Sequence, residues 1–171
     1  MDLKSYVREI PDFPKKGVSY KDITPLLLDH KAMQLAVKLF LENLPKGNID
    51  KVVGIESRGF LFATLLAEKL NAGFIPVRKP GKLPYQVHRE VYELEYGKDS
   101  LEIHEDAILK GEKILLHDDV LATGGTAAAT CKLIEKCGGE IVQCNFLVEL
   151  EFLKGLNKLK NYNVSSLIKY P

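Results

Sequence analysis

The chain has 171 residues, 46% hydrophobic and 27% charged, a balance that is ordinary for one globular domain. A formal net charge of +1 gives no electrostatic reason to expect a nucleic acid, and no apolar run approaches the roughly 20 residues of a membrane span. The N-terminus lacks a signal-peptide core, and three cysteines without Cys-x-x-Cys spacing indicate reduced thiols in a cytoplasmic protein.

Helices and short apolar strands alternate through the first half of the chain. Pro11 stops the first expected helix, and Thr24 with Pro25 opens the second, since proline is tolerated at the first helical position. In chain order we expect a helix over residues 3–10, a loop over 12–17, helices over 24–28 and 31–44, a strand over 51–55, a helix over 61–70 and a strand over 72–77.

The second half continues the alternation and predicts a parallel sheet flanked by helices. In chain order we expect a β-ribbon over 86–96, a strand and turn over 101–109, a strand over 114–120, a helix over 127–136, a strand over 140–150, a short helix over 152–159 and a strand over 164–170. His117 lies inside the central strand, where alternation points it opposite Asp118, so we expect a neutral core histidine.

The stretch from residue 114 to 130 combines a strand, two acids, a glycine turn and a helix start. Asp118 and Asp119 come where the strand is expected to end, and Thr-Gly-Gly-Thr at 123–126 precedes the helix. Such a turn exposes backbone N–H groups and positive partial charge, which suit a phosphate monoester. The acids suit neutral hydroxyls or a shared Mg²⁺. The stretch therefore predicts a sugar-phosphate site, with a plain polar turn as the alternative; the P-loop and Gly-x-Gly-x-x-Gly patterns are absent.

Two further charged segments follow strands. Glu-Ser-Arg-Gly-Phe at 56–60 lies at a strand-to-helix turn, where open parallel sheets bind ligands, and the guanidinium of Arg58 suits a diphosphate. The strand at 72–77 runs into the basic loop, residues 78–85, which carries cations and two prolines. The alternatives are a surface ion pair for Arg58 and a solvated loop for residues 78–85.

Asp-Asp-x-x-Ala-Thr-Gly-Gly-Thr at 118–126 resembles the phosphoribosyl pyrophosphate (PRPP) motif of the type I phosphoribosyltransferases. In that family the acids bind the ribose hydroxyls and the Thr-Gly-Gly-Thr loop binds the 5'-phosphate. Relatives for 6-oxopurines usually have an acid before Thr-Gly; this chain has Ala122, so the resemblance is to the adenine phosphoribosyltransferases. It implies that PRPP or AMP is bound by Asp118, Asp119, Ala122, Thr123, Gly124, Gly125 and Thr126.

Residues 56–60 resemble the pyrophosphate loop of the same family, and residues 78–84 resemble its Arg-Lys-x-Gly-Lys-Leu-Pro segment. The resemblance implies a cis peptide between Glu56 and Ser57, and it implies that Arg58 takes part in catalysis. It also implies that PRPP or AMP is bound by Glu56, Ser57, Arg78, Lys79 and Lys82. Of these, the three cations would neutralise the leaving diphosphate together with Arg58.

Residues of about 78–97 resemble the family's mobile β-hairpin, which closes over PRPP and ends in Leu-Glu-Tyr-Gly at 94–97. The resemblance implies that Glu95 contacts the purine and that Tyr96 approaches the sugar. Adenine loses a proton as its N9 bonds to carbon, and Glu95 is the candidate acceptor because Ala122 cannot serve.

The segment at 12–25 resembles the part of the family that forms a small hood over the base, here about residues 1–28. The resemblance implies that Tyr20 stacks on adenine, with Leu150 on the second face, although Leu150 could equally be a core leucine. Backbone groups of Ser19 and Lys21 would read the Watson–Crick edge. An N–H and C=O pair complements adenine and would be left unpaired by a 6-oxopurine.

The resemblance implies one domain, residues 1–171, with a type I phosphoribosyltransferase fold: a parallel α/β sheet flanked by helices, an N-terminal hood and a mobile β-hairpin. The implied activity converts adenine and PRPP to AMP and diphosphate, in a cytoplasmic homodimer. Mg²⁺ would be held mainly by PRPP and, through water, by Asp118 or Asp119. The alternatives are a PRPP-binding regulator, for which no DNA-binding module is evident, and an enzyme for orotate or xanthine, which the hood sequence disfavours.

Overall fold

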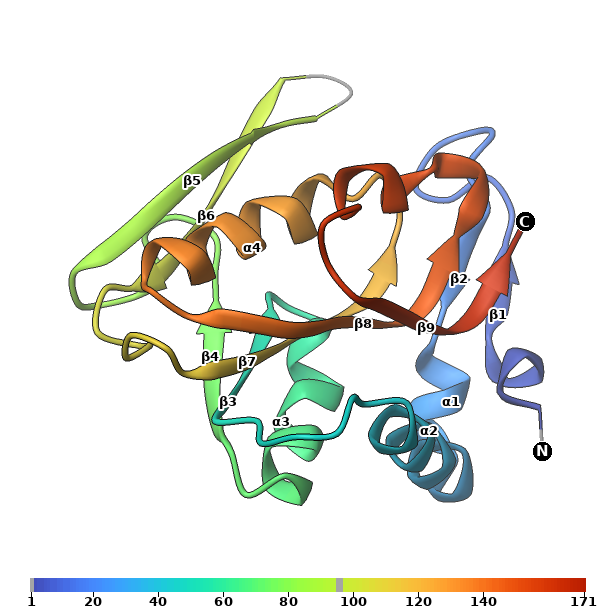
Figure 1. Ribbon diagram of the computed structural model, residues 1–171. Coiled ribbons are helices and arrows are strands. Elements are labelled where there is room, and N and C mark those ends of the chain that lie inside the picture. The colour runs from blue at the N-terminus through green and yellow to red at the C-terminus, as the bar shows by residue number, and fades with distance from the viewer. Residues whose placement is uncertain (1, 95–96) are drawn as a thin grey trace. The chain divides into compact units, whose positions relative to one another are not determined.

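The chain folds into two units, Met1–Glu42 and Asn43–Pro171, in a computed structural model that describes residues 2–94 and 97–171 (Figure 1). The hood predicted at residues 1–28 lies inside the first unit, which also includes one further helix. The central motif and the two charged segments at 56–60 and 78–85 all lie inside the second unit.

The N-terminal unit combines a short hairpin with helices. Its elements are η1 (Leu3–Tyr6), β1 (Arg8–Ile10), β2 (Tyr20–Asp22), α1 (Thr24–Leu28) and α2 (His30–Glu42). The prediction of one helix over 3–10 was wrong, because only a single 3₁₀ turn forms before the chain joins β1. An isolated turn is a poor helix nucleus, whereas β1 gains an antiparallel ladder with β2, in which Glu9 lies opposite Lys21.

The loop between β1 and β2 is ordered by local contacts, as its sequence predicts. Asp12 has a positive φ of 54°, and its Oδ1 accepts a hydrogen bond of 2.7 Å from the backbone N–H of Gly17. The rings of Phe13 and Tyr20 meet edge to face at 5.1 Å between centroids. The loop therefore fixes the direction from which Tyr20 enters β2.

The C-terminal unit is built on a five-stranded parallel sheet of order β4-β3-β7-β8-β9. Helices α3 and α4 cover opposite faces (Figure 1), so the strands read as nearly continuous apolar runs. This confirms the predicted parallel sheet flanked by helices. The elements are β3 (Lys51–Ile55), α3 (Gly59–Lys69), β4 (Gly73–Val77), β7 (Lys113–Leu121), α4 (Gly125–Lys136), β8 (Glu140–Leu150) and β9 (Val164–Tyr170).

The second hairpin of the chain, in the C-terminal unit, lies along α4 (Figure 1). Its antiparallel strands are β5 (Val87–Glu93) and β6 (Lys98–His104). An isolated bridge between Arg78 and Glu102 joins β6 to the chain that leaves β4. The ribbon expected over 86–96 is confirmed for its described residues, and β6 starts three residues before the strand expected at 101.

Two boundaries near the central motif differ from the predictions. The central strand β7 continues to Leu121, so Asp118 and Asp119 lie within it rather than after it, and the ladder with β8 fixes their backbone. The single helix expected over 152–159 is replaced by two 3₁₀ turns, η2 (Glu151–Leu153) and η3 (Gly155–Lys158). Lys154 separates them in the left-handed conformation, with φ of 55°.

Candidate active site

The acid pair of β7 lies against the start of α3. A Cβ atom added to Gly59 would be 2.8 Å from Oδ1 of Asp118 and 3.1 Å from the carbonyl oxygen of His117. Only glycine therefore permits this close approach of helix to strand. The segment at 56–60 and the acid pair, which are far apart in sequence, meet at the carboxyl ends of β3 and β7.

Asp118 and Asp119 are unusual in both burial and charge. Burial and the neighbouring Asp119 carboxylate hold the pKa of Asp118 well above its ordinary range. Burial also raises the pKa of Asp119, and the guanidinium of Arg58 opposes that rise, with Nε of Arg58 lying 2.7 Å from Oδ2 of Asp119. The pair can therefore accept hydroxyl donors or a nearby cation, both of which favour the ionised carboxylates.

The Thr-Gly-Gly-Thr loop forms a backbone cradle at the N-terminus of α4. Gly124 precedes the helix with a positive φ of 80°, and a Cβ there would lie 2.4 Å from the carbonyl oxygen of Gly155. A Cβ on Gly155 would in turn lie 2.4 Å from the carbonyl oxygen of Ala122. The loop and the start of η3 are thus in contact through two glycines.

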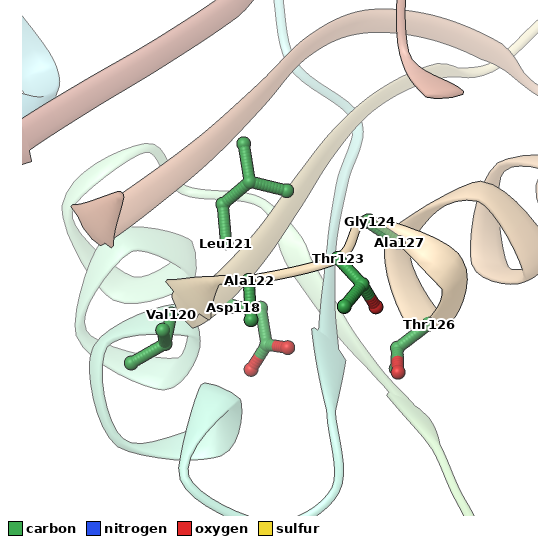
Figure 2. Close-up of a pocket in the computed structure, with 8 residues that line it drawn as sticks. All are labelled: Asp118, Val120, Leu121, Ala122, Thr123, Gly124, Thr126 and Ala127. Carbon is green, nitrogen blue, oxygen red and sulfur yellow. The ribbon is translucent and has the colours of Figure 1, made fainter. Parts of the chain in front are cut away.

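A cavity of about 70 Å³ opens at this cradle (Figure 2). In Figure 2 the carboxylate of Asp118 and the hydroxyls of Thr123 and Thr126 lie on the same side of the loop. The cavity thus brings one carboxylate and two hydroxyl groups to the same space. Its lining residues are Asp118, Val120, Leu121, Ala122, Thr123, Gly124, Thr126 and Ala127.

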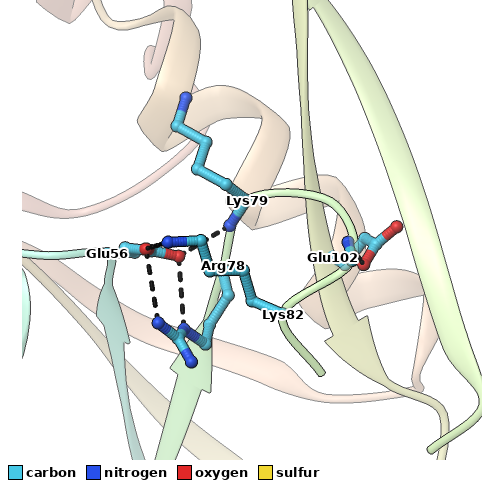
Figure 3. A network of polar contacts seen from close by, with 6 residues as sticks. Glu56, Arg78, Lys79, Lys82 and Glu102 are labelled. Carbon is cyan, nitrogen blue, oxygen red and sulfur yellow. Dashed lines mark hydrogen bonds and ion pairs between the residues drawn. The ribbon is translucent and has the colours of Figure 1, made fainter. Parts of the chain in front are cut away.

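The peptide between Glu56 and Ser57 is cis, which confirms the prediction. The Glu56 side chain is 11% exposed and accepts contacts from three residues of the basic loop (Figure 3). Nε of Arg78 lies 3.2 Å away, the backbone nitrogen of Lys79 2.8 Å and Nζ of Lys82 3.1 Å. The structure therefore brings the segments at 56–60 and 78–85 together around one carboxylate.

Charge balance at Glu56 favours its ionised form. Burial by itself raises the pKa of Glu56, but the hydrogen bonds from the Lys79 backbone, Lys82 and Arg78 outweigh it and lower the pKa. Glu56 therefore neutralises the side chains of Arg78 and Lys82 in this structure.

Lys79 turns its ammonium towards the hairpin. It forms an ion pair with Asp99 of β6, and its Nζ lies 3.1 Å from the hydroxyl of Tyr92 on β5. Burial lowers the pKa of Lys79, but the contacts with Asp99 and Tyr92 outweigh it and raise the pKa above its ordinary value. Lys79 therefore ties the basic loop to the hairpin in this structure.

His117 is a neutral core residue, as predicted. It is fully buried, its Nδ1 lies 2.7 Å from Oδ1 of Asn145, and burial lowers its pKa to about 4. The histidine therefore remains uncharged at neutral pH.

The residues predicted to contact adenine lie on different parts of the chain. Ser19 precedes β2, Tyr20 and Lys21 lie in β2, and Leu150 ends β8. Lys21 is 7% exposed, and its Nζ lies 2.5 Å from Oε2 of Glu9. Their adenine contacts stay predictions. Glu95 and Tyr96 lie outside the described residues.

Sequence reasoning missed three contributors to this region. Gly155 supports the cradle, Asp99 holds Lys79, and the buried Glu102 accepts a hydrogen bond from the basic loop at Gly81. Glu102 carried no signal, because strand alternation between Leu101 and Ile103 predicts an exposed side chain. Gly155 carried none, since nothing near it in sequence marks a contact with residue 124.

The acid pair fits an indirect role towards Mg²⁺. Asp119 is buried, Asp118 is half-buried, and both carboxyl groups have raised pKa values, so a nearby cation would relieve their repulsion. Across residues 2–94 and 97–171, no group of three or more His, Cys, Asp or Glu side chains could hold a metal ion.

In the same described parts of the chain, no helix is both long and apolar enough to cross a membrane.

Known proteins similar to this chain match over nearly its full length. The adenine phosphoribosyltransferase of Christiangramia forsetii is 85% identical over 170 residues, covering 99% of this chain and 99% of that protein. The corresponding protein of Flavobacterium johnsoniae is 58% identical over 170 residues, covering 99% and 100%.

Solved structures give the same result. The adenine phosphoribosyltransferase of Thermoanaerobacter pseudethanolicus matches with a TM-score of 0.95 at 51% identity, covering 98% of each chain. The Saccharomyces cerevisiae enzyme, complexed with D-2,5-dideoxy-2,5-imino-altritol 1,6-bisphosphate and adenine, matches with a TM-score of 0.91 at 44% identity, covering 96% of each chain.

A family model described as a phosphoribosyl transferase domain matches residues 20–166, and this range includes the acid pair, the Thr-Gly-Gly-Thr loop and the segments that meet at Glu56. The fold, the local geometry and the full-length relatives agree, and the chain therefore belongs to the adenine phosphoribosyltransferases, a family of transferases.

Proposed function

We propose that this protein transfers the phosphoribosyl group of PRPP to adenine and releases AMP and diphosphate. The observation that carries the proposal is the meeting of an acid pair with a cationic segment, seen in the 2.7 Å contact of Arg58 with Asp119. A sugar diphosphate needs both kinds of group, because its hydroxyls donate hydrogen bonds while its leaving group is an anion.

The chemical difficulty is breaking the anomeric C–O bond of PRPP. Positive charge develops on the ribose ring while negative charge grows on the diphosphate. Asp118 and Asp119 would hold the ribose hydroxyls and lie near the developing positive charge. Arg58, with the cations of the basic loop, would stabilise the diphosphate. Closure of the hairpin would exclude water, which would otherwise capture the ribosyl cation.

Phosphate recognition would rest on the cradle at the start of α4. Backbone N–H groups of Gly124 to Thr126 and the hydroxyls of Thr123 and Thr126 are donors suited to the 5'-phosphate. When bound with PRPP, Mg²⁺ would neutralise part of the diphosphate charge. The Mg²⁺ ion would be held mainly by PRPP, and Asp118 or Asp119 would contact it through water.

Substrate selectivity tests the proposal most directly. The protein is incubated with PRPP, Mg²⁺ and adenine, hypoxanthine, guanine, xanthine or orotate, and nucleotide formation is followed. We expect kcat/KM for adenine to exceed that for hypoxanthine by about a thousandfold or more, because a mismatched base leaves buried polar groups unpaired. Comparable turnover of a 6-oxopurine would refute the adenine assignment, and PRPP binding without turnover would indicate a regulator.

We further propose that Glu95 accepts the adenine proton. Glu95→Gln should leave PRPP affinity nearly unchanged and lower kcat about a hundredfold, the usual scale for one proton-transfer group. Asp119→Asn is the matched comparison, and it should impair both KM for PRPP and kcat. If Glu95→Gln forms AMP at the wild-type rate in a single turnover, the residue has no chemical role.

We also propose a cytoplasmic homodimer. Leu61 and Leu65 lie one turn apart on α3 and are 43% and 36% exposed, so a partner could cover them. The cysteines are free thiols, including Cys131 and Cys144 with 3.7 Å between their sulfur atoms, which suits a reducing compartment. Sedimentation of wild type and of Leu65→Lys would test the dimer; a wild-type monomer would contradict it.

A further inference from the structure

We propose that Glu102 is a positioning residue, which fixes the basic loop for diphosphate and couples that loop to the hairpin. The inference rests on the diphosphate role proposed above for the basic loop. Glu102 is a buried carboxylate. Among the described residues, its side-chain hydrogen bonds are with Gly81 and Arg89, and neither belongs to the acid pair or to the Thr-Gly-Gly-Thr loop.

Glu102 is a buried anion whose two oxygens serve different elements. The residue is 2% exposed. Its Oε1 accepts hydrogen bonds from Nε and Nη2 of Arg89 on β5, at 2.9 Å and 2.5 Å. Its Oε2 accepts one of 3.1 Å from the backbone N–H of Gly81. A carboxylate is costly to bury unless it is paired and hydrogen-bonded, so these partners account for its place in the fold.

The backbone of Glu102 holds the beginning of the same loop. The N–H of Arg78 donates to the carbonyl of Glu102 at 3.0 Å, and the N–H of Glu102 donates to the carbonyl of Arg78 at 2.8 Å. Its side chain then holds Gly81, where the chain turns with φ of 78°. One residue of β6 therefore fixes two points of the loop, one on each side of Lys79.

Glu56 and Glu102 hold the basic loop in different ways (Figure 3). Glu56 contacts the cationic groups of Arg78 and Lys82, so a diphosphate would have to displace it. The Glu102 carboxylate contacts the loop at the backbone N–H of Gly81, and its ion pair is with Arg89, outside the loop. Glu102 can therefore keep its contacts while the loop cations change partners, as positioning of the loop requires.

The contact with Arg89 extends the arrangement to the hairpin. Arg89 and Glu102 are directly opposite each other in the β5–β6 ladder. A movement of β5 would therefore shift Arg89 and, through it, the Glu102 carboxylate that accepts a hydrogen bond from Gly81. Hairpin position and the placement of the loop cations are linked through Glu102.

The test uses Glu102→Gln, which keeps the side-chain shape and removes the charge. We expect KM for PRPP and the Kd of magnesium diphosphate, measured by calorimetric titration, to rise about tenfold, the effect of weakening one buried charged contact. KM for adenine should change less than about twofold, since the loop contacts no base in the proposal. Arg89→Gln should act in the same direction, and the double variant should show less than the summed loss.

Matched controls separate the possible outcomes. Glu90 lies in the same hairpin, and its carboxylate is 3.2 Å from Nζ of Lys132. Glu90→Gln removes that carboxylate and should leave the Kd for diphosphate unchanged. Lys82→Gln tests the loop itself and should weaken diphosphate binding. If Lys82→Gln weakens binding and Glu102→Gln does not, the positioning role is wrong. If neither does, the diphosphate role of the loop is wrong as well.

Folding failure does not leave the proposal untested. Should Glu102→Gln not fold, Arg89→Gln decides, because the Arg89 side chain is 56% exposed and the glutamine amide can still donate a hydrogen bond to Glu102. An unchanged diphosphate Kd in folded Arg89→Gln, or an equal loss in Glu90→Gln, would overturn the coupling. A loss in Arg89→Gln alone would support it.

Discussion

The Thr-Gly-Gly-Thr loop and the basic loop, which we propose bind the two anionic ends of PRPP, are built in opposite ways. The first is fixed by backbone contacts, with Gly124 and Gly155 so close that neither position has room for a Cβ atom. The second is fixed by carboxylates from separate strands, Glu56 after β3 and Glu102 in β6. One anion site depends on shape and the other on charge.

This difference gives the two sites different behaviour before a ligand binds. The cradle at the start of α4 is held by the close backbone contacts of Gly124 and Gly155, which do not depend on side-chain charge. The cations near Glu56 and Asp119 are already neutralised, because Arg58 pairs with Asp119 and Arg78 pairs with Glu56. We infer that the 5'-phosphate enters a preformed site, whereas the diphosphate exchanges partners with carboxylates.

The largest expected effect comes from disrupting the backbone contacts of the Thr-Gly-Gly-Thr loop. Gly155→Ala would place a Cβ 2.4 Å from the Ala122 carbonyl, so the cradle has to shift. We expect kcat/KM to fall about a hundredfold, since a small misplacement at a reacting site is costly. Gly111→Ala is the control, because Gly111 has a φ of 85° but nothing within 4 Å of an added Cβ. It should lose about 1–2 kcal/mol of stability and little activity. Equal activity losses in Gly155→Ala and Gly111→Ala would show that the close contact of Gly155 with Ala122 does not matter for activity.

A smaller effect separates the two sites by ionic strength. Raising salt from about 50 mM to 200 mM shortens the range of charge interactions and weakens exposed ion pairs most. We expect diphosphate Kd to rise about threefold to tenfold, and ribose 5-phosphate Kd to rise less. Titration of each ligand against the wild-type protein provides the comparison. Equal salt dependence would mean that the cradle also relies on side-chain charge.

The smallest expected effect concerns the acid pair. The pKa of Asp118 is raised in the folded protein above 3.8, so its ionisation costs stability as pH rises. Asp118→Asn should therefore raise Tm at pH 7 by about 2–4 °C, the change that about 1 kcal/mol produces in a domain of this size. The gain should vanish below the unfolded pKa, where both states are protonated.

Thermal unfolding across a pH series checks this prediction. Asp106→Asn, in the exposed turn after β6, is the matched control and should change stability by less than about 0.5 kcal/mol. A Tm for Asp118→Asn at or below the wild-type value at pH 7 would show that the ionised Asp118 carboxylate does not destabilise the fold.

The sequence by itself determined the features that are contiguous along the chain. Apolar runs at 51–55 and 140–150 indicated buried strands because both sheet faces are covered, and the glycine turn at 124–125 indicated a helix start. It also determined that His117 is a core residue, since strand alternation sets its side. Motif resemblance added the cis peptide at Glu56, which no periodicity could reveal.

Only the tertiary structure decided which groups meet across long sequence separations. The contact of Gly155 with Gly124, the pairing of Lys79 with Asp99 and the double use of Glu102 depend on strand order and register. Local propensity cannot specify them, because each joins elements that the sheet brings together only after folding. The same holds at residues 8–10, where pairing with β2 outweighed a short helical turn.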